Sequence, residues 1–183
     1  NLWIHGDGGT DVINVDNGGS GANAFRTSDA AAGRLTSTQL SGLNLDGVIT
    51  YGSVEDLNLL LGSGQDLFEV NSTHAGITNL SSGGGSDDIT VGNGEDTLSG
   101  IAGVLNIDAG SDADTLTLDN RGASTEQSGN LSDTQLSGFG MSGHISFPGL
   151  ENITLHLGSG VDHLSVESTI AGAMEVHTGS GAD

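Results

Sequence analysis

Two adjacent nine-residue stretches place an acidic side chain at the same position of a glycine-rich turn. Residues 83–91 read GGGSDDITV and residues 92–100 read GNGEDTLSG, so Asp87 and Asp96 are nine residues apart. Glycine allows a tight turn with positive φ, and the apolar residue two places after each Asp points into a core. Calcium prefers carboxylate and carbonyl oxygens, which such turns present together. Asp87 and Asp96 are therefore candidate calcium ligands.

The same kind of turn recurs along the chain at nearly equal steps. Asp66 and Asp87 are 21 residues apart, as are Asp162 and Asp183, and Asp114 follows Asp96 by 18. A recurring turn at such steps is typical of coils that stack their turns one over another. Departures from the pattern occur at Asp11, Asp112 and Asp114. Asp11 follows GGT, and Asp112 replaces the second glycine before Asp114, where it either adds a ligand or disturbs the turn.

A long repeat contains these shorter ones. TQLSG at 38–42 recurs at 134–138, and LGSGQD at 61–66 recurs as LGSGVD at 157–162, both at an offset of 96. Upstream, GTDVINVDN at 9–17 matches DADTLTLDN at 112–120 at an offset of 103. The difference places an insertion in GGSGANAFRTSDAAAG of the first copy. We expect one continuous unit over 1–183, made of two long repeats, approximately 1–96 and 97–183.

Apolar residues alternate with polar ones after nearly every turn. The pairs two and four places after a turn Asp are Ile13 and Val15, Phe68 and Val70, Ile89 and Val91, Leu116 and Leu118, and Leu164 and Val166. Strict alternation predicts strands with one buried face. Residues 24–35 are the only helical candidate, and a loop fits them better. The predicted fold is all-β: a right-handed parallel β-solenoid, like a β-roll or β-helix, with coils of roughly 20 to 28 residues stacked at about 4.8 Å.

Composition narrows the classes of partner. The formal net charge is −21, from 24 acidic residues against three arginines, Arg26, Arg34 and Arg121. That charge opposes compaction unless cations neutralise it, and it argues against nucleic acid or an anionic membrane as a partner. There is no cysteine, which excludes disulfides and thiolate zinc sites, and no apolar run long enough to span a membrane. Because the chain starts without Met and stops at Asp183 in mid-motif, we expect it to be part of something longer.

The two nonapeptides at 83–100 resemble the repeats-in-toxin family, whose pattern G-G-x-G-x-D-x-U-x forms a calcium-bound parallel β-roll. The larger unit is similar to the long repeats of very large secreted bacterial proteins. The first resemblance implies that each turn Asp binds Ca²⁺ together with backbone carbonyls of adjacent coils. On that basis the ligands are Asp66, Asp87, Asp96, Asp114 and Asp162, with Asp11 and Asp183 added by position.

Two alternatives to calcium binding stay open. The turn Asp side chains could accept hydrogen bonds from turn amides, as they do in calcium-free solenoids. His156 and His177, 21 residues apart, could form a stacked pair able to bind a transition metal. The favoured interpretation of these histidines is an outward-facing polar position, because Leu155 and Leu157 take the inward slots.

Three functions are considered, in order of preference. The first is a calcium-stabilised structural module of a secreted or cell-surface bacterial protein, acting as a spacer or adhesin stalk, with neighbouring repeats capping its open ends. The second is a surface for a carbohydrate or another cell surface, with Trp3, Tyr51 or Phe147 stacking on sugar rings. The third, a polysaccharide-active enzyme, is disfavoured, because every Asp belongs to a repeated turn and no unique polar cluster stands apart. We therefore expect no catalysis.

Overall fold

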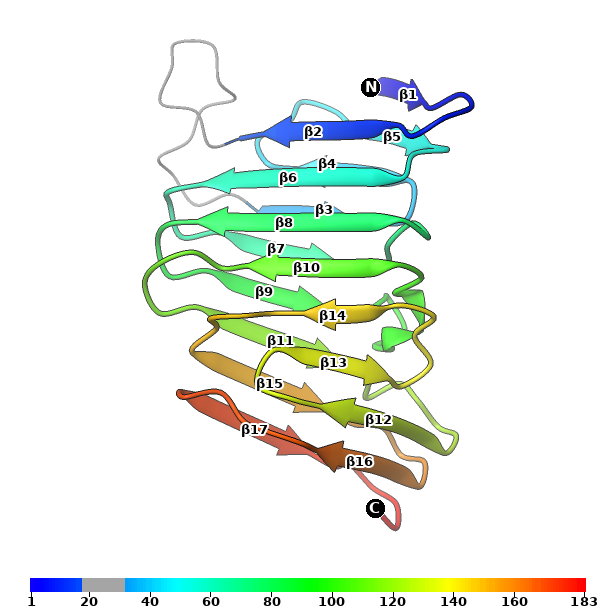
Figure 1. Ribbon diagram of the computed structural model, residues 1–183, viewed down its shortest axis with the longest axis vertical. Coiled ribbons are helices and arrows are strands. Elements are labelled where there is room, and N and C mark those ends of the chain that lie inside the picture. The colour runs from blue at the N-terminus through cyan, green and yellow to red at the C-terminus, as the bar shows by residue number, and fades with distance from the viewer. Residues whose placement is uncertain (18–31) are drawn as a thin grey trace.

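The computed structural model describes residues 1–17 and 32–183, and in these residues the protein is all-β. Two sheets account for nearly all of the regular structure (Figure 1). The first half of the chain forms β1 (Leu2–His5), β2 (Val12–Asp16), β3 (Ala32–Leu35), β4 (Gln39–Gly42), β5 (Ile49–Gly52), β6 (Asp56–Gly62), β7 (Leu67–Val70), β8 (Ile77–Gly83) and β9 (Asp88–Val91). The second half forms the 3-10 helix η1 (Leu98–Gly100), β10 (Val104–Asp108), β11 (Thr115–Asp119), β12 (Gln127–Leu131), β13 (Gln135–Gly138), β14 (His144–Ser146), β15 (Asn152–His156), β16 (Asp162–Val166) and β17 (Ala173–His177).

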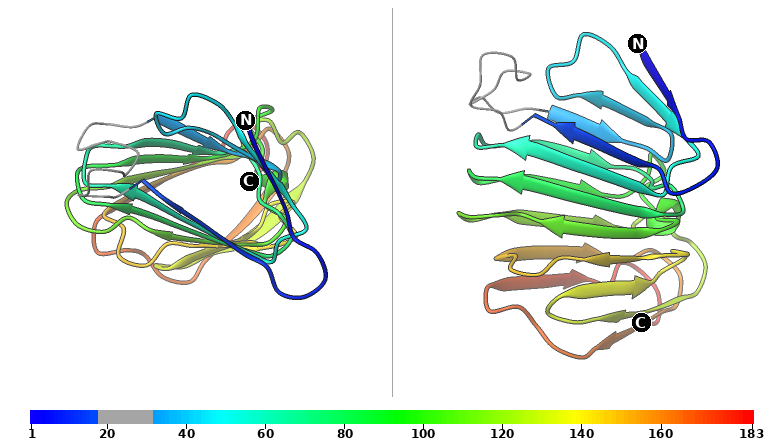
Figure 2. Two further views of the ribbon diagram at one scale, coloured as in Figure 1. Left: turned by 90° about the horizontal axis from the view of Figure 1, so that it is seen from above. Right: turned by 45° about the horizontal axis from the view of Figure 1, so that its top comes forward.

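The two sheets are mixed, and neither closes on itself. The nine-stranded sheet has the order β1-β5-β4-β3-β7-β9-β11-β15-β17, and the eight-stranded sheet has the order β16-β12-β13-β14-β10-β8-β6-β2. Seen along the long axis they face each other, and the two termini lie at opposite ends of that axis (Figures 1 and 2). Strands of the nine-stranded sheet such as β7, β9 and β11 point to the right in Figure 1, whereas β2, β6, β8 and β10 point to the left.

The predicted alternation builds the core between the sheets. Phe68, Val70, Ile89 and Val91 are each 0% exposed and belong to one cluster that runs the length of the molecule. Burying such side chains contributes about 1.5–3 kcal/mol each relative to exposure. The predicted alternation of buried and exposed residues along the strands is therefore confirmed.

The alternation does not bury every predicted residue. Val166 is 52% exposed, and Val15 and Leu164 are only partly buried. These residues lie on β2 and β16, which are the outermost strands of the eight-stranded sheet. An inward-pointing side chain on an edge strand lacks a neighbour on one side, and this accounts for their exposure.

Parallel pairing throughout the chain is the part of the predicted fold that is wrong. Most neighbouring strands are parallel, but β3-β4-β5 and β12-β13-β14 are antiparallel meanders within a sheet. The predicted stacking of each strand between its equivalents therefore holds only in part.

Local turn chemistry explains these meanders. The Oγ1 atom of Thr36 accepts the backbone N–H of Gln39 at 3.0 Å, which closes the turn between β3 and β4. Beyond β4 the chain turns back through Gly42 and Leu43, with φ of 78° and 53°. Side-chain hydroxyls and left-handed residues favour tight reversals over long crossovers. TQLSG, a marker of the long repeat in sequence, is thus a reversing strand.

The two long repeats occupy opposite sheets. β1, β3, β4, β5 and β7 lie in the nine-stranded sheet, and their counterparts β10, β12, β13, β14 and β16 form the same succession in the eight-stranded sheet. Conversely, β2, β6 and β8 lie in the eight-stranded sheet, and β11, β15 and β17 lie in the nine-stranded one. Within one long repeat the chain passes between the two sheets an odd number of times. Each strand of the second copy therefore lies in the sheet opposite to that of its counterpart, which amounts to a rotation of the second copy by half a circuit. At the offset of 96 the counterpart of β9 would fall after Asp183, the last residue given, and this accounts for the difference of one strand between the two sheets.

A ladder of amides runs across the outer face of the eight-stranded sheet. Each Nδ2 atom donates to the Oδ1 of the preceding Asn at 2.8 Å, from Asn106 to Asn79, from Asn79 to Asn58 and from Asn58 to Asn14. In-register parallel strands bring identical side chains together in this way. The amides of Asn58 and Asn79 therefore each use one N–H group and the oxygen in contacts between strands.

Candidate functional site

Three of the predicted Asp residues form a ladder along one edge of the nine-stranded sheet, the edge at which the strands begin and not an outermost strand. The backbone N–H of Asp66 donates to Oδ1 of Asp87 at 2.8 Å, and the backbone N–H of Asp87 donates to Oδ1 of Asp114 at 2.8 Å. These residues lie where β7, β9 and β11 begin, the left ends of these strands in Figure 1. All three are 1–3% exposed. We call Asp66, Asp87, Asp114 and the terminal Glu151 the long ladder.

Glu151 ends the long ladder with a longer side chain. The backbone N–H of Asp114 donates to Oε2 of Glu151 at 3.2 Å. Burial raises the pKa of Asp114, and the nearby charges of Asp87, Glu151 and Asp112 raise it further, against a backbone hydrogen bond from Asp87 that lowers it. The ladder thus satisfies backbone amides at the cost of bringing negative charges together.

The remaining ladder contacts lie at the opposite edge, where strands of the eight-stranded sheet begin. The backbone N–H of Asp11 donates to Oε2 of Glu55 at 2.7 Å, and that of Asp162 donates to Oδ1 of Asp183 at 3.0 Å. Gln127 extends the second contact, donating its backbone N–H to Oδ1 of Asp162 at 3.2 Å. These contacts repeat those of Asp114 with Glu151 and of Asp66 with Asp87. The half-circuit rotation of the second repeat places the copies at opposite edges.

Glycines hold the corners beside the ladders close together. Gly83 has a φ of +98°, and a Cβ on it would lie 1.8 Å from the carbonyl oxygen of Gly62. Gly110, one circuit on, has a φ of +88°, and its Cβ would lie 1.8 Å from the carbonyl oxygen of Gly83. Only glycine fits both the backbone angle and the close approach. The close packing of successive turns therefore requires glycine in the G-x-G element, independently of any bound ion.

One carboxylate oxygen at several of these positions is buried without a hydrogen-bond partner in the described structure. The atoms are Oδ2 of Asp11, Asp87 and Asp162. Asp87 is 2% and Asp162 is 3% exposed. An ionised, buried carboxylate is unfavourable unless it is paired. These oxygens are hard anionic ligands of the kind that calcium accepts.

The arginines in the described part of the chain are engaged elsewhere. Arg34 forms an ion pair with Glu69, and Arg121 forms one with Asp119. Arg26 lies outside the described residues. Neither Arg34 nor Arg121 forms an ion pair with a ladder carboxylate.

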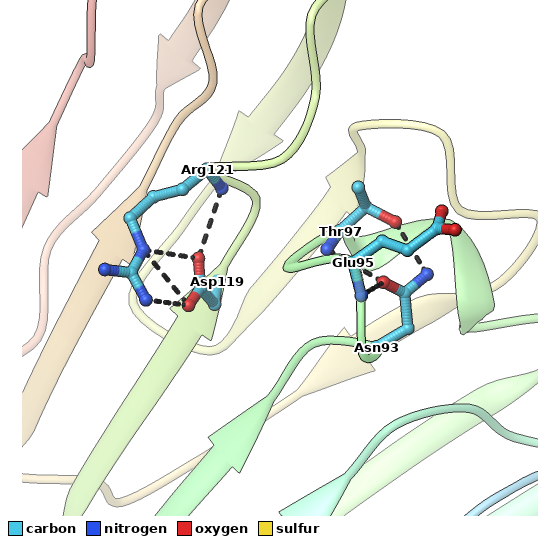
Figure 3. A network of polar contacts seen from close by, with 5 residues as sticks. All are labelled: Asn93, Glu95, Thr97, Asp119 and Arg121. Carbon is cyan, nitrogen blue, oxygen red and sulfur yellow. Dashed lines mark hydrogen bonds and ion pairs between the residues drawn. The ribbon is translucent and has the colours of Figure 1, made fainter.

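Asp96, the second of the tandem pair, lies in a loop organised by Asn93, whose contacts with Glu95 and Thr97 are drawn in Figure 3. Oδ1 of Asn93 accepts the backbone N–H groups of Glu95 and Thr97 at 2.9 and 3.1 Å, and its Nδ2 donates to Oγ1 of Thr97 at 2.7 Å. Asp96 is exposed, with a φ of 54°. The chain continues into η1 and not into a strand, although Leu98 is buried as predicted. Asp87 and Asp96 therefore lie at opposite ends of β9, and the structure does not bring them into one ladder.

Asp112 is exposed and supports the neighbouring corner. Its φ is 86°, and its Oδ2 atom accepts the backbone N–H of Gly85 at 3.2 Å. The sequence left open whether Asp112 adds a ligand or disturbs the turn. In the structure the turn forms with the backbone of Asp112 in the left-handed region. Its role as a metal ligand stays a prediction.

Sequence reasoning missed the ion pair of Asp119 and Arg121, which Figure 3 also shows. Nε of Arg121 donates to Oδ1 of Asp119 at 2.9 Å, and the backbone N–H of Arg121 donates to the same oxygen at 3.1 Å. Burial would raise the pKa of Asp119, but the hydrogen bonds and charge of Arg121 outweigh it and hold the pKa below its ordinary value. The signal in the sequence was a rare arginine two residues after a strand-ending acid.

His156 and His177 stack on the outer face, as the repeat predicts. Their ring centroids are 4.7 Å apart with an interplanar angle of 14°, while Leu155 and Leu157 are buried. The outward-facing interpretation is confirmed. Burial, the facing His177 and the charge of Arg121 lower the pKa of His156, although Asp119 opposes this effect.

Two of the three aromatic residues predicted to stack on sugars are buried. Tyr51 is 2% and Phe147 is 0% exposed, so both belong to the core, whereas Trp3 is 67% exposed. The hydroxyl of Tyr51 donates to the backbone oxygen of Thr36 at 2.5 Å, and burial raises its pKa. Tyr51 thus links β5 to the turn after β3, and neither Tyr51 nor Phe147 can form a binding platform.

No group of three or more His, Cys, Asp or Glu side chains in residues 1–17 and 32–183 is arranged to hold a metal ion by itself. Among the same residues, no helix has the length and apolar character needed to span a membrane. Comparisons with protein-family models, curated proteins and solved structures each found no match. The resemblance of residues 83–100 to calcium-binding repeats therefore stays a prediction.

Proposed function

We propose that this chain is a structural module, a right-handed β-solenoid with mainly parallel strand pairing, stabilised by calcium, which serves as a spacer or adhesin stalk in a large secreted or cell-surface bacterial protein. The elongated stack of strands, with its termini at opposite ends, supports a spacer role (Figure 1). Mostly parallel pairing of strands from successive circuits supports the solenoid, with one antiparallel meander inserted in each long repeat.

The observation that carries the calcium proposal is the orphaned Oδ2 atom of buried Asp87, together with that of Asp162. Their Oδ1 atoms already accept backbone N–H groups, so the amide ladder uses half of each carboxylate and leaves the other half free for a cation. Asp87 and Asp162, which lie at opposite edges, would each hold a separate ion, and backbone carbonyls and water would complete the six to eight oxygens that calcium takes. The bound ion would neutralise charge that burial otherwise penalises.

Folding coupled to calcium would suit an extracellular location. With a net charge of −21, the chain repels itself where cations are scarce. A cation bound only by the folded state adds RT ln(1 + [L]/Kd), about 2.7 kcal/mol per site at 100 times Kd. Extracellular calcium modules commonly bind at about 10⁻⁴ to 10⁻³ M.

The test is a comparison of unfolding in chelator and in millimolar-range calcium, with magnesium and sodium at matched ionic strength to remove general screening. Circular dichroism should report a higher melting temperature in calcium, and calorimetry should give the number of ions bound. Asp87→Asn and Asp162→Asn should each weaken the response, whereas Asp88→Asn, at an exposed neighbouring position, should preserve it. Identical melting in chelator and calcium would overturn the calcium role.

Carbohydrate binding on the predicted aromatic platform receives little support from the structure. Of the predicted platform only Trp3 is exposed, and its neighbour in a ring contact is His5, at 6.4 Å between centroids. We therefore retain the structural module as the single proposal.

A further inference from the structure

A groove crosses the outer face of the eight-stranded sheet, on the half of the sheet where its parallel strands end. Its volume is about 590 Å³, which is within the range of ligand-binding clefts. It passes over β2, β6, β8, β10 and β14 and therefore follows the stack of strands seen in Figure 1. Five strands about 4.8 Å apart give it a length of about 19 Å. None of the described ladder carboxylates lines it, so it is a surface distinct from the candidate calcium sites.

One wall of the groove is the row of hydrogen-bonded asparagines from Asn14 to Asn106, which we call the amide ladder. Within it, Asn58 and Asn79 each use one N–H group and one lone pair of the oxygen in contacts at 2.8 Å. A carboxamide has two N–H groups and two lone pairs, so each of these side chains keeps one donor and one acceptor site. Both are partly exposed. The other wall contains Leu60, which is 40% exposed.

The fold does not require these side chains, because the second long repeat forms the equivalent strands without them. The counterpart of β6 is β15, which has Thr154 at the position of Asn58 and His156 at the position of Leu60. β15 pairs in parallel with both of its neighbours, as β6 does. The amides and the exposed leucine are therefore particular to the groove, and strand pairing alone does not account for them.

The charges around the groove argue against two classes of ligand. No described arginine lines it, and the chain has a net charge of −21, so an anionic ligand is repelled. The acidic side chains at the groove are Asp16 on β2 and Asp108 on β10, which are three strand spacings or about 14 Å apart. A cation needs its oxygen ligands around one point, so these two carboxylates cannot share one. A neutral ligand remains.

We infer that this groove binds a neutral, extended polysaccharide, whose sugar rings lie along the amide ladder. A sugar hydroxyl both donates and accepts hydrogen bonds, so it matches an amide that has one N–H group and one lone pair to spare. The strand spacing of about 4.8 Å is close to the advance per ring of an extended β-linked sugar chain, so successive rings meet successive amides. An extended peptide advances by about 3.3 Å per residue and loses this register. Leu60 adds an apolar contact for the C–H groups of a ring.

This site differs from the aromatic platform that the sequence suggested. Tyr51 and Phe147 are buried, whereas the groove holds a sugar chain by amide hydrogen bonds and by its shape. The inference goes beyond the spacer role. Because the groove and the candidate calcium sites share no residue, sugar binding and calcium binding can fail separately.

The test is a titration of the folded chain, in calcium, with neutral oligosaccharides. The probes are cellohexaose and mannohexaose, with polygalacturonate as the acidic polysaccharide and an extended peptide of Ser, Asn and Gly as the alternative class of ligand. In NMR spectra of the isotope-labelled chain, the side-chain amide signals of Asn58 and Asn79 should shift with at least one neutral probe. Calorimetry should give a Kd of about 1 mM or lower for that probe.

Three variants test the location of the site. Asn58→Thr introduces the residue of the second repeat and should weaken binding by up to about tenfold, the effect of one lost hydrogen bond. Ser81→Trp fills the groove from outside the amide ladder and should abolish binding. Thr154→Ala, at the counterpart position on the opposite sheet, should leave the affinity unchanged. Circular dichroism verifies that each variant is folded. No shift with either neutral probe, stronger binding of polygalacturonate or of the peptide, or undiminished binding by either groove variant would each overturn the inference.

Discussion

The Oδ1 atom of Asp87 lies 2.8 Å from the backbone nitrogen of Asp66, 21 residues earlier in the chain. The side chain that recurs in the turns thus bonds the amide of its own equivalent one circuit away. This contact repeats between Asp114 and Asp87 and between Asp183 and Asp162. A recurring Asp at these corners therefore has a structural reason that holds with or without a cation.

Two substitutions distinguish the role of Asp87 as a hydrogen-bond acceptor from its proposed role as a cation ligand. Asp87→Ala removes the acceptor of a buried amide, and we expect the free energy of unfolding to fall by about 1–3 kcal/mol in chelator. Asp87→Asn retains an acceptor oxygen and removes a buried charge, so in chelator it should be at least as stable as the unmodified chain. Urea denaturation measures both, with the exposed Asp88→Asn as the control. If Asp87→Asn loses as much stability as Asp87→Ala, the amide contact is not what Asp87 contributes.

Asp114 predicts a pH dependence of known sign. Its pKa is raised from 3.8 by burial and by neighbouring acids, so ionisation costs stability in the folded state. That cost is absent below 3.8 and develops as the pH rises through the raised pKa. Asp114→Asn removes the ionisation, so in chelator the stability of Asp114→Asn relative to the unmodified chain should grow as pH rises over this window. A difference that stays flat with pH would contradict this assignment.

The two described arginines should differ in importance. Arg121→Ala leaves Asp119, 5% exposed, without its ion-pair partner, and because the Arg121 side chain is itself 60% exposed we expect a loss of about 1–3 kcal/mol at neutral pH. Arg34→Ala breaks a pair with Glu69, which is 44% exposed, and should cost at most about 1 kcal/mol. Because the pKa of Asp119 is lowered, its contribution is present above the ordinary value and lost as pH falls through the lowered one. Equal losses in the two variants, measured by chemical denaturation, would refute this ranking.

Glycine substitutions test the corner geometry. Gly83→Ala combines a φ of +98° with a Cβ 1.8 Å from a backbone oxygen, so we expect a loss of about 2–4 kcal/mol. Gly94→Ala is the matched control, because a Cβ there meets nothing within 4 Å. Thermal unfolding of the two variants should differ by several degrees or more. Similar melting temperatures would mean that the corners can separate.

Sequence reasoning predicted the strands well because the pattern of burial is local. Alternation around Phe68 and Val70, or around Leu116 and Leu118, identifies the buried face without any knowledge of neighbours. It failed for Val166, because burial there depends on a strand that is not present beside it. It also missed the meander at Thr36–Gln39, where a hydroxyl group and left-handed residues reverse the chain.

The candidate site was predicted in its residues but not in its arrangement. The repeated turns identified Asp66, Asp87 and Asp114, which do share a ladder, yet they also grouped Asp87 with Asp96, which lies in an Asn93-centred loop at the other end of β9. A short turn motif specifies a bend and a carboxylate. It does not specify whether the chain leaves the bend as a strand, as after Asp87, or as a 3-10 helix, as after Asp96.

The amino-acid sequence by itself determined the all-β character, the alternating core and the offset of the two long repeats, since these depend on residue type and spacing. Only the tertiary structure decided that the repeats lie in opposite sheets and that their acidic corners therefore divide between two edges. The physical reason is the odd number of crossings between sheets in each repeat. Similarity between copies is unchanged by a half-circuit rotation, so spacing alone cannot reveal on which side of the core a corner lies.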